Sequence, residues 1–307
     1  MGRKDKKFKK KKWPWILGIL GVIVVGLGIY LFTIYNSFTN TLDEIHEPIE
    51  REVSEKRTID QEVVLNEKDP FSVLLLGVDE REDDRGRSDT MVVMTVNPAD
   101  ESTKMVSIPR DTYTEIVGRG TTDKINHAYA FGGIEMSMAT VENLLDIPID
   151  YVLQVNMEGF QDIVDAVGGV EVNNSLAFDE FKEGKIELDG EEALAYVRMR
   201  KQDPEGDFGR QNRQKQVIQG IMKKGASVNS LLNYKDIFNA LGDNVRTNMT
   251  FDEMMDVQSN YRDAIGTVDQ LMVEDGTGET INGIWYYMMN DAELAEIQST
   301  LKTHLNM

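Results

Sequence analysis

The chain is 307 residues long and contains 53 acidic and 33 basic residues, for a formal net charge of −20. Residues 1–12 carry eight lysines and arginines and one aspartate, so the rest of the chain holds a net charge of −27. Such an acidic body argues against nonspecific binding of nucleic acid. The chain has no cysteine, which excludes thiol catalysis, cysteine–zinc sites and a disulfide-dense eukaryotic ectodomain.

A long apolar segment follows the basic tail. Residues 13–35 contain no Asp, Glu, Lys or Arg and are long enough to cross a bilayer core of about 30 Å. The lysines before this segment predict a cytoplasmic N-terminus. A cleaved signal peptide is the alternative, but residues 35–38, YNSF, offer no small-x-small cleavage site. We therefore expect an uncleaved, single-pass type II signal-anchor in the cell membrane of a Gram-positive-type bacterium, with an extracytoplasmic C-terminal domain.

The remaining sequence predicts a stalk over residues 36–66 and one folded domain over residues 67–307. Near-continuous apolar runs are typical of strands buried on both faces of a sheet, whereas helical periodicity and capping residues indicate helices. Strands are expected at 71–79, 91–98, 104–111, 151–156, 170–173, 267–274 and 281–287. Helices are expected at 125–146 (with a glycine break at 132–133), 157–169, 193–197, 209–224, 227–242, 250–264 and 290–305. This alternation predicts an α/β fold in three layers, with a central, mostly buried β-sheet flanked by helices.

Two aspartates are the first candidate site residues. Asp79 ends the first predicted strand, and Asp89 lies in the GRSDT segment that follows. Ligands of open α/β sheets collect at the carboxyl ends of strands, and Mg²⁺ prefers one or two carboxylates completed by phosphate oxygens and water. We therefore expect a metal site at Asp79 and Asp89, with Arg87 close to the same phosphates. The alternative is a loop in which these side chains only make turns and surface ion pairs.

The next candidates lie at the end of the third predicted strand and at the start of the helix after it. Arg110, in the SIPRDT segment, would face the same pocket, although Arg110 and Asp111 could also form an ordinary salt bridge. The KINHAY segment at 124–129 opens a helix, and a helix N-terminus favours anions. His127 in this segment is more often a packing or capping residue than a catalyst. The three histidines of the chain show no metal-binding spacing.

The segment richest in candidate ligands is RMRKQDPEGDFGRQNRQKQ, residues 198–216. It contains the arginines Arg198, Arg200, Arg210 and Arg213. A guanidinium fits phosphate oxygens two at a time, so clustered arginines in an acidic protein indicate a bound anion. Helical spacing places Arg210 and Gln214 on the stripe that must pack inward, with Arg213 at its margin. A solvated charged face, or arginines that offset a helix dipole, is the alternative. The cluster predicts a diphosphate pocket with guanidiniums on one side and a metal ion on the other.

Five strings occur in a fixed order behind the apolar segment, between residues 73 and 216: LLLGVD, GRSDTM, SIPRDT, KINHAYAFGG and RMRKQDPEGDFGRQNRQ. On these motifs the chain closely resembles the LytR-CpsA-Psr family. The resemblance implies a central sheet between helices, with an apolar groove for a polyprenyl chain. It also implies a phosphotransferase that moves an anionic polymer, such as wall teichoic acid, from undecaprenyl diphosphate to peptidoglycan. The acceptor would be the C6 hydroxyl of N-acetylmuramic acid, in the final step of polymer attachment.

The resemblance also implies roles for individual residues. Asp79 and Asp89 would hold Mg²⁺ or Mn²⁺, and Asp79 is a candidate acceptor for the hydroxyl proton. The residues that would contact the diphosphate are Arg87, Arg110, Arg198, Arg200, Arg210 and Gln214. Arg110 would be catalytic, and Arg213 matches a further basic position of the motif. The expected partners are the lipid-linked polymer, peptidoglycan and the cell membrane, with no nucleic acid.

Two other functions remain open from the sequence. The same pocket would serve a polyprenyl-diphosphate phosphatase, in which water replaces the sugar hydroxyl. A non-catalytic, wall-associated regulator would not need an intact arginine cluster. Lipid-linked polymer supplied with and without peptidoglycan distinguishes the phosphatase from the transferase, and the activity of an Arg110→Ala protein tests the regulator.

Overall fold

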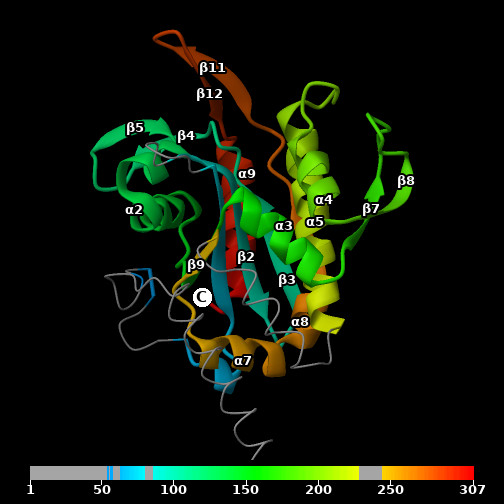
Figure 1. Cartoon of the computed structure of the whole chain (residues 1–307). Coiled ribbons are helices and arrows are strands. Elements are labelled where there is room, and N and C mark those ends of the chain that lie inside the picture. The colour runs from blue at the N-terminus through cyan, green and yellow to red at the C-terminus, as the bar shows by residue number, and fades with distance from the viewer. Residues whose placement is uncertain (1–53, 55, 58–62, 80–85, 228–243) are drawn as a thin grey trace, which may run out of the picture.

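The computed structural model describes residues 54, 56–57, 63–79, 86–227 and 244–307 (Figure 1). The predicted basic tail, the membrane segment and most of the stalk lie outside this part of the chain. Nearly all of the helix expected at 227–242 also lies outside it. Among the described helices, none combines the length and the apolar character that crossing a bilayer requires.

A six-stranded sheet forms the centre of the domain, in the order β10-β3-β2-β1-β6-β9. Its strands are β1 (Phe71–Val78), β2 (Ser88–Asn97), β3 (Ser102–Ser107), β6 (Tyr151–Val155), β9 (Val245–Thr247) and β10 (Val268–Leu271). β1 pairs in parallel with β6, and β3 with β10, whereas the other neighbouring pairs are antiparallel. The sheet is therefore mixed, which the alternation of strands and helices does not by itself reveal.

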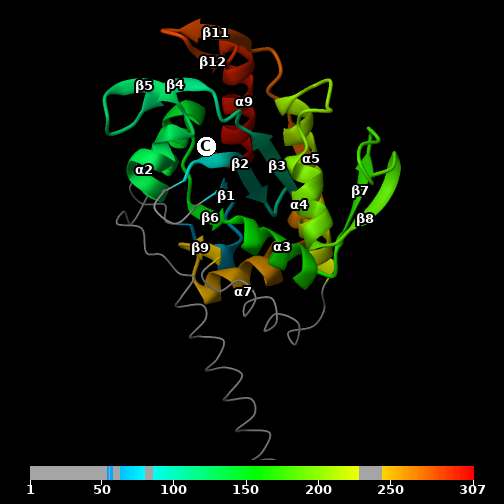
Figure 2. The same cartoon turned by 45° about the horizontal axis from the view of Figure 1, so that its top comes forward.

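Helices cover both faces of this sheet, as the apolar runs predicted (Figures 1 and 2). They are η1 (Leu65–Glu67), α2 (His127–Leu145), α3 (Met157–Ala166), α4 (Gly190–Arg198), α5 (Asp207–Ser227), α7 (Phe251–Asn260), α8 (Arg262–Gly266) and α9 (Asp291–His304). Leu74 and its cross-strand partner Val93 pack into a core with α2 and α9. The next pair, Leu75 and Val92, faces the other layer, where Ile218 of α5 packs against Val92. Successive strand residues point to opposite faces, so burial on both faces explains the continuous apolar sequence.

Several helix boundaries follow their sequence signals. The predicted break in α2 occurs at the glycine pair, where Gly133 has a φ of 64°. Asp189 and Glu192 form the predicted capping box at the start of α4. The single helix expected at 250–264 is instead two helices, α7 and α8, which meet at Tyr261. This side chain is fully buried, so the chain turns where its ring enters the core.

Within the described residues, three two-stranded hairpins lie outside the central sheet, and the sequence signals for them were weak. They pair β4 (Tyr113–Ile116) with β5 (Thr121–Lys124), β7 (Val170–Asn174) with β8 (Gly184–Leu188), and β11 (Thr277–Ile281) with β12 (Ile284–Met288). Of these six strands, only β7 and β12 match strands that the sequence predicted. The sequence also did not predict β9 of the central sheet. Short polar stretches such as TTDK in β5 have little strand propensity, so these strands depend on their partners.

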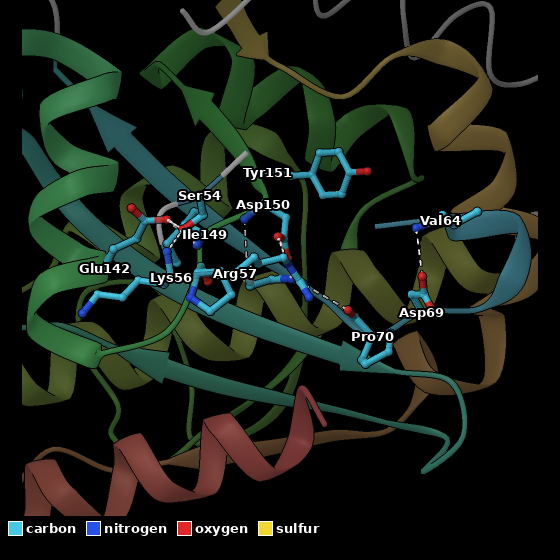
Figure 3. A network of polar contacts seen from close by, with 12 residues as sticks. Ser54, Lys56, Arg57, Val64, Asp69, Pro70, Glu142, Ile149, Asp150 and Tyr151 are labelled. Atoms are coloured by element: carbon cyan, nitrogen blue, oxygen red, sulfur yellow. Dashed lines mark hydrogen bonds and ion pairs between the residues drawn. The ribbon is translucent and has the colours of Figure 1, made fainter. Parts of the chain in front are cut away.

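Ser54 and Arg57, which lie within the predicted stalk, are bound to the folded domain (Figure 3). Ser54 donates from Oγ to Oε1 of Glu142 at 2.6 Å. The guanidinium of Arg57 binds the two carboxylate oxygens of Asp150 at 2.6 Å each, and Asp150 accepts from the backbone N–H of Ser72 at 2.8 Å. β1 and β6 both begin at this edge, so Arg57 contacts the domain where these parallel strands start.

Candidate active site

Polar residues from distant segments meet at the opposite edge of the sheet. β1, β3 and β6 run in one direction, since β1 is parallel to β6 and both β1 and β3 are antiparallel to β2. Asp79 follows β1, Arg110 follows β3 and Asn156 follows β6, while Asp89 lies at the start of the oppositely directed β2. The topology therefore gathers all four residues at the carboxyl edge, where open α/β sheets bind ligands.

Two cavities open at this edge and share a wall formed by Asp79 and Asp89. The apolar cavity, of about 380 Å³, is further lined by Leu75, Gly77, Val78, Thr90, Met94, Leu153, Val155, Asn156, Met157, Phe160, Ile163, Leu194, Val197, Arg198, Arg210, Gln214, Ile218, Ile221 and Met222. The polar cavity, of about 430 Å³, is further lined by Gly86, Arg87, Arg110, Asp111, Lys124, Asn126 and His127. Together they form one amphiphilic site with two carboxylates at the join.

Ion pairs organise the polar cavity. Nη1 of Arg110 lies 2.8 Å from Oδ1 of Asp89, and its Nε lies 3.7 Å from Oδ2 of Asp111. Lys124 binds the other oxygen of Asp111 with its Nζ at 2.6 Å. Burial acts to lower the pKa of Arg110, but the carboxylates of Asp89, Asp207 and Asp111 together more than offset this and raise it. The cations of this cavity are thus held by carboxylates, and an entering phosphate would compete for them.

α5 supplies the opposite wall of the apolar cavity. Arg210, Gln214, Ile218 and Ile221 line it, as expected for residues that share one face of a helix. Val217 lies outside the cavity and is fully buried in a core with residues of α4 and β7. The helix is therefore turned so that its polar first turn and its apolar middle face the same cavity.

Arg210 is a nearly buried cation, with a side chain that is 11% exposed and Nη2 at 2.8 Å from Oδ1 of Asp207. Its Nε has no hydrogen-bond partner among the described residues. Burial lowers the pKa of Arg210, and the charges of Arg110 and Arg200 act in the same direction, against the carboxylate of Asp207. A bound anion would supply both the missing acceptor and the compensating charge.

The remaining predicted arginines differ in position. Arg198, the last residue of α4, lines the apolar cavity, and Arg87 lines the polar one. Arg200 lines neither; its side chain is 53% exposed, with Nε at 3.7 Å from Oδ1 of Asp207. Arg200 therefore lies beside the site, where its charge affects Arg210.

The structure does not bring Arg213 to either cavity. Its Nη1 lies 2.5 Å from Oδ2 of Asp203, and its side chain is 6% exposed. Its Nε donates to the carbonyl of Tyr196 at 3.1 Å, and Nη2 donates to the carbonyl of Met199. Both carbonyls belong to the end of α4, so Arg213 connects α5 to α4.

Comparison with known proteins places this geometry in a family. The sequence profile described as the LytR_cpsA_psr family matches residues 32–303, most of the chain. This chain belongs to the LytR-CpsA-Psr family. The polyisoprenyl-teichoic acid–peptidoglycan teichoic acid transferase TagU of Bacillus subtilis (strain 168) is 52% identical over 309 residues, covering 99% of each chain. The protein of that name from Bacillus anthracis is 52% identical over 303 residues, covering 97% of this chain and 99% of its own.

Solved structures of LytR-CpsA-Psr proteins have the same fold. The crystal structure of B. subtilis TagU matches with a TM-score of 0.63 at 52% identity, over 78% of this chain and 97% of its own. TagT bound to LIIa-WTA matches with a TM-score of 0.74 at 34% identity, over 85% of this chain and 100% of its own. The central mixed sheet between helices is therefore the arrangement of the family.

Sequence reasoning did not single out several residues that line the cavities. Asp111, Lys124 and Asn126 belong to the motifs SIPRDT and KINHAYAFGG, and their place after a strand or before a helix was the available signal. Oδ1 of Asn126 is buried and has no hydrogen-bond partner within the described part of the chain. Apolar lining residues such as Leu153 and Phe160 had no signal, because a cavity wall and a closed core have the same composition.

Asp79 and Asp89 are the carboxylates that could hold a metal ion. Within the described ranges, no three His, Cys, Asp or Glu side chains form a group that would bind a metal by themselves. Two carboxylates at the join of the cavities suit Mg²⁺, which completes its shell with phosphate oxygens and water. Mn²⁺ accepts the same oxygen ligands.

Proposed function

We propose that this chain is a membrane-anchored phosphotransferase that attaches an anionic wall polymer, wall teichoic acid, to peptidoglycan. The join of an apolar cavity to a polar cavity at Asp79 and Asp89 carries the proposal. A polymer linked to a polyprenyl diphosphate is divided in the same way, with a hydrocarbon chain and a hydrophilic polymer on either side of two phosphates. The relatives named for this reaction support the assignment.

The prenyl chain of undecaprenyl diphosphate would occupy the apolar cavity. Burying hydrocarbon contributes about 0.8 kcal/mol per CH₂, which favours a long chain over a short one. Arg198, Arg210 and Gln214 lie in the same wall as the apolar residues, so they would contact the diphosphate where the hydrocarbon ends. Arg87 and Arg110 would contact it from the polar cavity. The polymer and its acceptor would then lie on the polar side.

The reaction forms a bond between the C6 hydroxyl oxygen of N-acetylmuramic acid and the phosphorus that carries the polymer. The bond from this phosphorus to the bridging oxygen breaks, and undecaprenyl phosphate leaves with the electron pair. Phosphoryl transfer depends on charge neutralisation and positioning more than on covalent chemistry by the protein. Arg110 and Arg210 would supply positive charge, and Asp79 is the candidate acceptor for the hydroxyl proton.

A divalent cation would be held by Asp79 and Asp89 and would neutralise phosphate oxygens. Asp89→Asn should raise the Mg²⁺ concentration needed for half-maximal transfer by about tenfold or more. Glu279→Gln, on the exposed strand β11, is the matched control and should leave it unchanged. Equal Mg²⁺ dependence in both variants would contradict this metal site.

The apolar segment at 13–35 would hold the domain outside the cell at the membrane surface, where lipid-linked donor and growing glycan are both present. Because the chain has no cysteine, single engineered cysteines can test this topology. A membrane-impermeant maleimide should label Lys185→Cys, whose native side chain is 75% exposed, in intact cells. Lys6→Cys should be labelled only after the membrane is broken. The reverse pattern would overturn the orientation.

The activity itself is tested with the full chain in detergent micelles and a lipid-linked polymer. With peptidoglycan present, the polymer should become glycan-linked and undecaprenyl phosphate should be released. Free polymer formed equally with and without peptidoglycan would indicate the phosphatase instead. Undiminished transfer by Arg110→Ala would show that Arg110 is not catalytic. No transfer and no release of polymer by the wild-type chain would favour the regulator.

A further inference from the structure

The hairpin of β11 and β12 carries an exposed aromatic side chain near the site. In Figures 1 and 2 this hairpin projects from the end of the domain where β4 and β5 also lie. Trp285 on β12 is 49% exposed, although tryptophan is a highly buried residue on average. An aromatic side chain of this size that is left open to solvent indicates a contact surface for a ligand or partner.

A glycine on the neighbouring strand makes room for this ring. A Cβ built on Gly278 would lie 2.6 Å from Nε1 of Trp285, 3.0 Å from Cε2 and 3.1 Å from Cζ2. The indole therefore lies across β11 at this position, where any side chain would displace it. Packing against Gly278 restricts the orientation of the ring, while half of the residue remains accessible.

Residues adjacent to Trp285 connect it to the polar cavity. Tyr286 packs edge-on against Tyr113 of β4, with 4.9 Å between the ring centroids. Tyr287 donates its backbone N–H to the carbonyl of Asp111 at 2.9 Å, and Asp111 lines the polar cavity. Asp111, a residue of the cavity wall, is therefore hydrogen-bonded to β12 two residues away from Trp285.

The negative charge of the hairpin favours a neutral glycan over an anionic polymer as its ligand. Residues 272–288 contain Glu274, Asp275 and Glu279 and no lysine or arginine. The neighbouring Lys124, with Nζ 5.8 Å from the centre of the Tyr286 ring, is itself paired with Asp111. The negative charges of the hairpin therefore disfavour an anionic polymer but not a neutral sugar. The C–H groups on one face of a pyranose ring carry partial positive charge, which complements the negative face of an aromatic ring. A neutral glycan strand fits both the ring and the charge.

We propose that Trp285 is a binding platform for the acceptor glycan, on which one sugar of a peptidoglycan strand stacks while a nearby muramic acid residue enters the polar cavity. This proposal rests on the transferase function proposed above and adds the surface that holds the acceptor. Trp285 takes no part in bond making. Its loss weakens acceptor binding and leaves donor binding and the chemical step unchanged.

The test uses the full chain in detergent micelles and a soluble oligosaccharide of alternating N-acetylglucosamine and N-acetylmuramic acid, with each lactyl carboxylate converted to a neutral amide. Trp285→Ala should raise the dissociation constant of the oligosaccharide and the acceptor KM about tenfold, as expected for the loss of one stacked ring. The turnover number and the donor KM should not change. Trp285→Tyr should recover much of the affinity. Ile284→Ala removes a neighbour that is 47% exposed on the opposite face of β12 and should have no effect.

Gly278→Ala provides a second, independent variant. It keeps Trp285 but introduces a Cβ into the space that the indole occupies. Gly278 does not have a left-handed φ, so alanine is compatible with its backbone. We expect this variant to weaken oligosaccharide binding as well. Thermal unfolding at the wild-type temperature would confirm that the variants are folded.

The outcomes separate this proposal from the proposed function. Unchanged oligosaccharide binding in Trp285→Ala, with transfer intact, would overturn the platform and leave the transferase standing. A rise in donor KM in place of acceptor KM would show that the ring contacts the anionic polymer and would also overturn it. If the wild type binds the oligosaccharide through Trp285 but transfers no polymer, the transferase fails and the glycan platform stands.

Discussion

Arg110, which lines the polar cavity, is ion-paired with Asp89 in the wall that the two cavities share, with Nη1 2.8 Å from Oδ1. One follows β3 and the other begins β2, and the sequence predicted them as ligands of two different groups, the diphosphate and the metal ion. In the structure each is the partner of the other. A diphosphate that arrives with its cation would provide a new, oppositely charged partner for both side chains at once. The pair therefore holds the two charges in position at the join.

Arg110→Ala should reduce the rate of polymer transfer on the order of 10²–10³, because it removes one charge-assisted contact to the transferring phosphoryl group. The two side chains are 22% and 38% exposed, so the free energy of unfolding should change by only about 1 kcal/mol or less. Single-turnover transfer and urea unfolding measure the two effects. A variant with near-normal transfer would remove Arg110 from the reaction.

Arg210→Ala should also reduce transfer on the order of 10²–10³ without destabilising the fold. Burial lowers the pKa of Arg210, and its Nε lacks a partner among the described residues, so the folded state gains little from this cation. The free energy of unfolding should remain at the wild-type value or rise. A large loss of stability with normal single-turnover transfer would contradict the placement of Arg210 in the site.

Arg213→Ala is the matched control, since it removes the same side chain from the next turn of α5. The expected effect is a loss of about 3–5 kcal/mol in the free energy of unfolding, because a buried ion pair loses one partner. Asp203, whose side chain is 5% exposed, would be left without its guanidinium, as would two carbonyls at the end of α4. Urea unfolding tests this. A stable Arg213→Ala protein with impaired transfer would assign this residue to the substrate instead.

The apolar cavity should make donor binding depend on prenyl length. Each isoprene unit removed from a diphosphate donor that fills the cavity should weaken binding on the order of 10²–10³-fold, because its five carbons contribute about 0.8 kcal/mol each when fully buried. Leu153→Trp fills part of the cavity and should flatten this dependence. Val64→Trp adds the same indole at a residue that is 38% exposed, and this variant should keep the wild-type dependence on prenyl length. Identical length dependence in both variants would show that the prenyl chain binds elsewhere.

His304 should make the fold sensitive to acid. Its ring is buried, with Nδ1 2.7 Å from Oγ1 of Thr95 and Nε2 3.0 Å from Oγ of Ser102. Burial lowers the pKa of His304 below its ordinary value of 6.5. The unfolded chain therefore takes up a proton at a higher pH than the folded chain. The contribution of neutral His304 to the free energy of unfolding should be fully present above pH 6.5. This contribution should be lost as the pH decreases from 6.5 through the folded-state pKa.

Urea unfolding between pH 8 and pH 5 measures this effect, at about 1.4 kcal/mol for each unit by which the two pKa values differ. His304→Gln removes the titrating group and should show a shallower decline below pH 6.5. Equal slopes for wild type and variant would mean that other groups cause the acid sensitivity.

Much of the fold could be predicted from local sequence. The apolar runs at β1, β2 and β3, the glycine break in α2 and the capping box of α4 each have a local physical cause, and all occur in the structure. The hairpins β4–β5 and β11–β12 were missed wholly or in part. Their strands are short and largely polar, so pairing with a partner stabilises them more than their own composition does.

The sequence by itself indicated that Asp79, Asp89 and Arg110 lie close to the ends of central strands, because apolar runs stop or begin beside them. The strand directions, which bring the three residues to one edge of the sheet, are a property of the tertiary structure. Only the tertiary structure decided which arginines of residues 198–213, from the end of α4 into α5, face that edge. Arg210 and Arg213 differ by about 60° around the helix axis, too little for sequence phasing to separate. Packing of α5 against α4 directs Arg210 into the apolar cavity and Arg213 to Asp203. The cavity itself also depends on tertiary structure, because its walls have the composition of an ordinary core and only the spacing of α3, α4 and α5 above the sheet leaves it open.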